Sequence, residues 1–105
     1  MAQSVGGGVL GDIQAVTNTW VTQQIDFVPT KVMLWWNYKS SGTTTGQPQI
    51  VLLDIATDKY YMWWVNNNGG EVTGWNDYFY VDGSTIYYKQ PDNNVLGVHY
   101  VAIKE

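Results

Sequence analysis

The chain has 105 residues, of which 45% are hydrophobic, 15% aromatic and 13% charged, so it is long enough for one globular domain with its own core. It contains no cysteine and no arginine, and its nine acidic residues outnumber its five lysines to give a net charge of −4. Because it lacks the basic surface of nucleic-acid-binding proteins and the ~20-residue apolar run of a membrane span, we expect neither nucleic-acid binding nor membrane insertion.

The first twelve residues are rich in small side chains and include Gly6-Gly7-Gly8 and Gly11. Ordering glycine costs more backbone entropy than ordering any other residue. We therefore predict an N-terminal arm over residues 1–12, followed by a single domain over residues 13–105. Either the arm is a mobile terminus, or it becomes ordered only against a neighbouring molecule.

Residues from Val16 onward are dominated by Val, Thr, Ile, Trp and Tyr, and turn residues recur every ~8–12 positions. This pattern predicts an all-β fold, an antiparallel, jelly-roll-like β-sandwich of about eight strands. The dipeptides Asn68-Gly69 and Asp82-Gly83 supply the positive φ angles that tight hairpin turns need. The predicted strands are Val16–Phe27, Lys31–Tyr38, Gln49–Ile55, Lys59–Val65, Glu71–Trp75, Tyr78–Val81, Thr85–Tyr88 and Gly97–Ile103.

Adjacent aromatic residues form four doublets: Trp35-Trp36, Tyr60-Tyr61, Trp63-Trp64 and Tyr87-Tyr88. Because neighbouring side chains of a strand point to opposite faces, each doublet sends one ring away from the core. A large aromatic side chain buries ~150–250 Å², so several outward rings exceed the apolar patch that a monomer usually exposes. We therefore expect something to cover them.

Three kinds of cover are open: a sister subunit, the long loop Ser40–Pro48, and a bound ligand. For so small a chain we favour the sister subunit, and the partner we expect is a further copy in a homo-oligomer. The candidate interface residues project from the outward faces of the predicted strands: Met33, Trp35, Ile50, Leu52 and one member of Trp63-Trp64.

Catalytic chemistry is sparse in this sequence. The single histidine, His99, is expected to be a packed residue of the last strand, and one histidine cannot build a metal cage. The acidic residues fall mostly at predicted strand ends and turns, where Asp bonds to its own backbone. We expect no enzyme, no catalytic residue, no metal and no cofactor; an enzyme that used Glu71 and Asp77 is a distant third hypothesis.

The alternative from a different class is a carbohydrate-binding, lectin-like receptor-recognition module. Sugar sites pair an aromatic ring, which stacks on the apolar face of a pyranose, with Asn, Asp or Gln side chains that bond to the hydroxyls. The same residues are also common in ordinary strands beside turns. The candidate ligand-binding residues are Trp63, Trp64, Trp75, Asn76 and Tyr78.

Two segments carry a family resemblance. In the first, Gln24–Trp35, an apolar strand ends in an aromatic residue and is followed by Pro29, Lys31 and a second apolar strand. The second runs from Val81-Asp82-Gly83-Ser84-Thr85-Ile86 through an Asn/Gly loop to the Tyr-containing strand Val98–Ile103. Together they resemble the small β-sandwich modules of tailed-bacteriophage virion proteins, found in tail, tail-fibre and surface structural proteins. Ser84 stands where that family usually continues with Gly-Phe.

The resemblance implies a non-enzymatic virion structural protein, commonly trimeric, on the particle surface. Capsid decoration, head fibre and tail attachment all remain open as roles. The implied partners are other virion proteins, reached through the N-terminal arm, and host-surface glycan if the carbohydrate-binding alternative holds.

Overall fold

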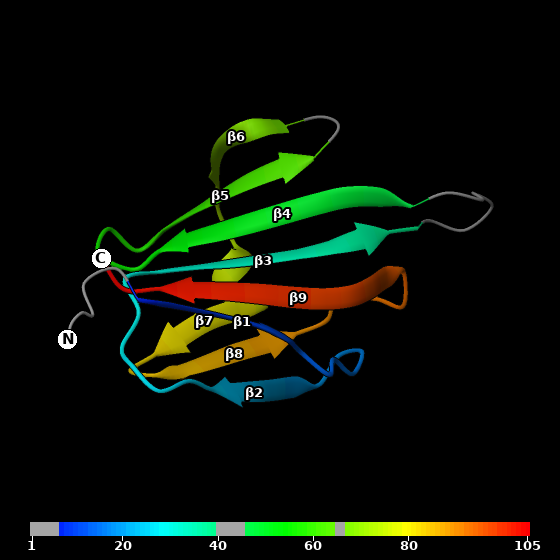
Figure 1. Cartoon of the computed structure of the whole chain (residues 1–105). Helices are drawn as coiled ribbons and strands as arrows, with labels where there is room; N and C mark the ends of the chain where they lie inside the picture. The colour runs from blue at the N-terminus through cyan, green and yellow to red at the C-terminus, as the bar shows by residue number, and fades with distance from the viewer. Residues whose placement is uncertain (1–6, 40–45, 65–66) are drawn as a thin grey trace.

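The computed structural model describes residues 7–39, 46–64 and 67–105, which fold into two antiparallel β-sheets (Figure 1). A six-stranded sheet has the order β1-β9-β3-β4-β5-β6, and a three-stranded sheet has the order β2-β8-β7. The predicted all-β antiparallel sandwich is therefore confirmed, with nine strands in place of about eight. The strands are β1 Gly8–Asp12, β2 Trp20–Gln24, β3 Lys31–Tyr38, β4 Gln47–Asp54, β5 Lys59–Trp64, β6 Asn67–Val72, β7 Phe79–Asp82, β8 Thr85–Lys89 and β9 Val95–Ile103.

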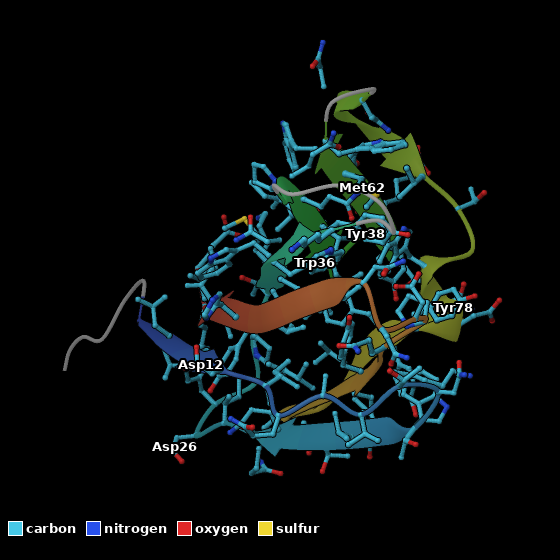
Figure 2. All side chains as sticks on the ribbon, turned by 90° about the vertical axis from the view of Figure 1, so that its right-hand side faces the viewer. Asp12, Asp26, Trp36, Tyr38, Met62 and Tyr78 are labelled. Carbon is cyan, nitrogen blue, oxygen red and sulfur yellow. The ribbon has the colours of Figure 1, made fainter. Side chains whose placement is uncertain are left out.

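Within the described parts of the chain, only one face of the six-stranded sheet is covered by other strands. Strands β3 to β6 follow one another as neighbours, a 3₁₀ turn at Trp75–Asp77 leads to the β7–β8 hairpin, and β9 returns between β1 and β3. The three-stranded sheet packs against a single face of the larger one (Figure 2). Among the described residues, no strand or helix packs against the opposite face.

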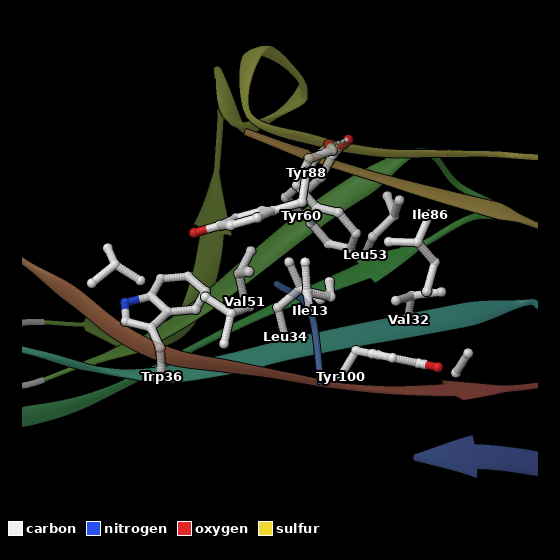
Figure 3. Packing of buried hydrophobic residues seen from close by; sticks show 14 of the residues in the cluster. Ile13, Val32, Leu34, Trp36, Val51, Leu53, Tyr60, Ile86, Tyr88 and Tyr100 are labelled. Atoms are coloured by element: carbon white, nitrogen blue, oxygen red, sulfur yellow. Dashed lines mark hydrogen bonds between the residues drawn. The ribbon is translucent and has the colours of Figure 1, made fainter. Parts of the chain in front are cut away.

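The core lies between the sheets and follows the alternation of the strands. Val32 and Leu34 point inward from β3, and Ile86 and Tyr88 face them from β8 of the three-stranded sheet (Figure 3). Burial of each such side chain contributes about 1.5–3 kcal/mol. The fully buried large side chains are Tyr88, Phe79, Leu34, Ile86, Val32 and Val51.

Three aromatic doublets divide between the two faces as the sequence predicts. Trp36, Tyr60 and Tyr88 are buried in the core, whereas their neighbours Trp35, Tyr61 and Tyr87 are only partly buried. The fourth doublet, Trp63-Trp64, differs because both rings are exposed at the end of β5. Alternation therefore places at least one ring of each doublet outside the core.

The expected arm at residues 1–12 needs correction in its second half. Gly8–Asp12 forms β1 at the edge of the six-stranded sheet, paired antiparallel with β9 from Gly8–Ile103 to Asp12–His99. The backbone hydrogen bonds to β9 and the packing of Val9 on the core outweigh the entropy that the glycines lose. Residues 1–6 of the arm lie outside the described residues.

Two predicted boundaries are also wrong. The long strand Val16–Phe27 is broken, because Asn18 adopts a positive φ of 57° and only Trp20–Gln24 pairs with β8. The Glu71–Trp75 strand lies earlier, since β6 is Asn67–Val72 and Trp75 begins the 3₁₀ turn.

The two predicted hairpin turns have different outcomes. The Asp82-Gly83 turn is confirmed, with Gly83 at a φ of 61° between paired Asp82 and Thr85. Asn68 and Gly69 instead lie within β6, at a shift of register opposite Met62 and Trp63. Gly69 has a φ of 90°, and a Cβ there would come within 2.5 Å of the Trp63 indole Nε1. The bulge lets this ring lie against the backbone of its neighbouring strand.

Candidate functional site

The side of the six-stranded sheet that faces away from the three-stranded sheet carries an apolar row that crosses five strands. The register places Leu10 of β1 beside Val101, Val101 beside Met33, Met33 beside Leu52, and Leu52 beside Tyr61. Alternating positions of each strand point this way because the intervening positions fill the core. With Trp35, Ile50, Trp63 and Ile103, these residues define what we call the large-sheet face.

A second row of the large-sheet face is mainly aromatic. Trp35 lies between Ile50 and His99 in the register, and the Trp35 and His99 ring centroids are 5.6 Å apart. His99 was expected to be a packed residue, but it projects from this face and its Nδ1 contacts an Asp12 carboxylate oxygen at 2.5 Å. The parity of β9 explains this outcome, because Val98 and Tyr100 take the inward positions.

Two shallow grooves hollow the large-sheet face. One, of about 250 Å³, is lined by Lys31, Met33, Leu52, Val101 and Ile103. The other, of about 400 Å³, is lined by Gln47, Pro48, Ile50, Trp63 and Trp64. Both are lined mainly by apolar side chains, so each could bind an apolar group of a partner.

Charged side chains frame this apolar surface and are paired with one another. Lys31 bonds to Glu105 at 2.5 Å, and Lys59 lies 3.8 Å from Glu71. The hydrogen bond that the Lys31 ammonium donates to Glu105 raises the pKa of Lys31 above its ordinary value. Exposed pairs of this kind add little to folding stability. They do give the large-sheet face an apolar centre and a polar rim of both signs, which is the arrangement typical of protein interfaces.

The structure brings the candidate interface residues together. Met33, Trp35, Ile50 and Leu52 all lie on the large-sheet face, half-buried at the centre of its rows. Trp63 joins them opposite Ile50, whereas Trp64 is its neighbour along β5 and reaches the larger groove. Their role in an interface stays a prediction.

The candidate sugar-binding residues do not form one surface. Trp63 and Trp64 line the groove described above, while Trp75 is half-buried, with its ring 5.7 Å from the core residue Trp36. Asn76 lines a different cavity, beside Lys59 and Glu71. Tyr78 meets the edge of Trp75 at 5.9 Å and lies beside the three-stranded sheet (Figure 2).

Four aromatic residues that are exposed or partly buried lie together on the three-stranded sheet, and of these the sequence had pointed only to Tyr78. The rings belong to Trp20 of β2, Tyr87 of β8, Tyr80 of β7, and Tyr78 just before β7. The alternation of each segment was visible in the sequence, but the order β2-β8-β7 was not. This surface, with the polar side chains between the rings, is called the small-sheet face below.

A metal site needs a group of ligating side chains that lie close together. Among the described residues, no group of three or more His, Asp or Glu side chains could hold a metal ion. Burial raises the pKa of Tyr60 to about 12 and raises that of Tyr88 further, which keeps both phenols neutral inside the core. Within the same residues, no helix has the length and apolar character needed to cross a membrane.

No protein-family model, curated protein or solved structure matches the chain.

Proposed function

We propose that the protein is a non-enzymatic structural subunit that assembles with further copies of itself through the large-sheet face. The observation that carries this proposal is the apolar row across five strands, on a face against which no described strand or helix packs. Leu10 is 69% exposed and Trp63 38% exposed at the two sides of this surface. A contiguous apolar surface framed by polar residues is the usual mark of an association site.

A second copy of the chain fits this face better than a strongly charged partner does. The rim presents Lys31 and Lys59 together with Asp12, Glu71 and Glu105, so both acidic and basic groups border the apolar centre. In a symmetric assembly the same patch serves both partners and must be self-complementary. A rim of both signs meets that need, whereas a single-sign rim would repel its own copy.

The setting that we propose is the surface of a bacteriophage particle, with the subunit in a trimer. Support for this part comes from the resemblance of Gln24–Trp35 and Val81–Ile103 to phage virion modules. Capsid decoration, head fibre and tail attachment are its possible roles. Docking through the N-terminal arm belongs to the same proposal, and residues 1–6 of that arm lie outside the described residues.

Sedimentation velocity across a wide range of protein concentration tests the assembly. We expect the wild-type protein to sediment as an oligomer of 11.9 kDa chains at micromolar concentration. Leu52→Glu places a carboxylate at the centre of the large-sheet face and should weaken association at least about tenfold, since burying an unpaired charge costs well over ~1.4 kcal/mol. Thr22→Glu, on the exposed small-sheet face, is the matched control and should associate normally.

A wild-type protein that stays monomeric throughout this range would overturn the proposal. So would association that Thr22→Glu abolishes and Leu52→Glu leaves intact, because a different face would then be responsible. A dimer that Leu52→Glu dissociates would support self-assembly through the large-sheet face and correct the expected trimer.

A further inference from the structure

The small-sheet face differs in chemistry from the large-sheet face. Its outward positions form three rows across β2, β8 and β7, and none of these positions holds an aliphatic residue. The aliphatic and aromatic residues at the intervening positions, such as Val21, Ile86 and Phe79, face the core. The outward rows are Trp20, Lys89 and Tyr78, then Thr22, Tyr87 and Tyr80, then Gln24, Thr85 and Asp82.

The rings of this face form one connected platform. Tyr80 and Tyr87 are stacked, with centroids 4.5 Å apart and planes 8° from parallel. Trp20 reaches across the middle strand to meet Tyr80 edge to face at 5.1 Å. These contacts fix the positions of the rings relative to one another, and Trp20 still exposes 40% of its surface and Tyr80 37%. The platform is therefore ordered before any ligand arrives.

Polar groups surround the platform. The Lys89 ammonium lies 5.2 Å from the Trp20 ring centroid and 5.9 Å from that of Tyr78. Among the described residues Lys89 has no ion-pair partner, so its N–H groups are free to donate. Thr22 is exposed beside the rings. In the third row Thr85 Oγ1 donates to Gln24 Oε1 at 2.7 Å, which fixes the Gln24 amide, and the exposed Asp82 lies on the other side of Thr85.

We propose that the small-sheet face binds a saccharide chain, which stacks on Trp20 and Tyr80 and bonds to Thr22 and Lys89. The C–H groups on one face of a pyranose are weakly positive and suit the negative face of an aromatic ring. Hydroxyls fill the sugar's edges and need donors and acceptors like those between the rings. This face offers no aliphatic side chain for a protein partner to pack against. A nucleic-acid partner would need more than the one lysine that the face presents.

The proposal concerns a different surface from the proposed assembly and does not depend on it. It also differs from the candidate sugar-binding set of the sequence analysis, of which only Tyr78 lies on this face. Trp63 is the residue that separates the two locations, because it is equally exposed but lies on the large-sheet face.

Affinity electrophoresis in native gels that contain a soluble polysaccharide tests the proposal directly. The probes are hydroxyethylcellulose, xylan, galactomannan and alginate, each compared with a gel without polymer. We expect at least one probe to retard the wild-type protein. Trp20→Ala and Tyr80→Ala should each weaken binding about tenfold, which corresponds to ~1.4 kcal/mol for one stacked ring. Tyr80→Phe, which keeps the ring, and Trp63→Ala, on the other face, should bind as wild type.

Circular dichroism checks the fold of every variant. Sedimentation velocity checks association, which should be unchanged in Trp20→Ala, Tyr80→Ala and Tyr80→Phe and weaker in Trp63→Ala, because Trp63 lies on the large-sheet face. If Trp20→Ala is poorly folded, the wild-type protein still decides the matter, because its Trp20 indole N–H resonance must shift when the retarding polymer's oligosaccharide is added. Absence of retardation by all four probes would overturn the proposal. So would binding that Trp63→Ala abolishes and Trp20→Ala leaves intact.

Discussion

Two buried tyrosines on opposite sides of the core should respond in opposite ways to the same change. The Tyr60 hydroxyl donates to the Phe79 backbone carbonyl at 2.5 Å, a bond that ties the six-stranded sheet to the three-stranded one. The Tyr88 hydroxyl is buried too, but it has no hydrogen-bond partner among the described residues. Replacing each tyrosine by phenylalanine removes one oxygen atom and keeps the ring in place.

The expected magnitudes follow from these partners. Tyr60→Phe loses a buried hydrogen bond and should lower the free energy of unfolding by about 1–2 kcal/mol. The Tyr88 hydroxyl loses its hydrogen bonds to water on folding and makes none in the core. Tyr88→Phe removes this hydroxyl and should leave the free energy of unfolding unchanged or raise it by about 1 kcal/mol. The surrounding ring contacts, such as that of Tyr88 with Trp36 at 6.5 Å, persist in the variant.

Urea unfolding monitored by tryptophan fluorescence measures both effects in one series. Equal slopes against urea concentration for the wild type and the two variants would show that only stability has changed. If Tyr88→Phe destabilises the protein as much as Tyr60→Phe does, the Tyr88 hydroxyl has a partner in the folded state and the reasoning fails.

Three further outcomes follow from the core and its edges. Gly69→Ala should cost about 1–3 kcal/mol in urea unfolding, because a side chain there meets both a positive φ and the Trp63 indole; wild-type stability would refute the bulge. In the wild type the buried Trp36 indole N–H donates to Gln49 Oε1 at 3.0 Å. Gln49→Leu removes this acceptor and should lower the free energy of unfolding by about 1–3 kcal/mol. An unchanged free energy would show that the indole N–H finds another acceptor. Burial raises the pKa of Tyr60 to about 12, so above pH 10 the Tyr60 phenol loses its proton in the unfolded state before it does so in the folded state. The free energy of unfolding should therefore fall above pH 10, and it should fall less in Tyr60→Phe. A pH dependence identical in both proteins would contradict this.

The inward and outward positions of the strands could be predicted because side-chain alternation is a local property. The segment Lys31–Tyr38 has apolar residues on both faces of the strand. Alternation alone therefore indicated that Trp35 and Trp36 would point to opposite faces. It also grouped Met33 with Leu52 on one surface, although the register that joins them was unknown. The Asp82-Gly83 turn was equally local, since it depends on the φ that glycine allows.

Features that depend on distant partners could not be predicted. Gly8–Asp12 becomes a strand because β9, more than eighty residues later, offers a free edge. Gly69 is a bulge and not a turn because the Trp63 ring needs the space above it. The small-sheet face needs Trp20 and Tyr80 on strands that meet only through β8, so neither local alternation nor composition could assemble it.

We expect a second copy of the chain to cover the large-sheet face. Isotope-filtered NMR on an equal mixture of labelled and unlabelled protein tests it most directly, because it detects contacts only between different molecules. We expect intermolecular contacts at the side chains of Met33, Ile50, Leu52 and Val101, all on that face. Intermolecular contacts confined to Trp20 and Tyr80, or none at a concentration well above micromolar, would contradict it.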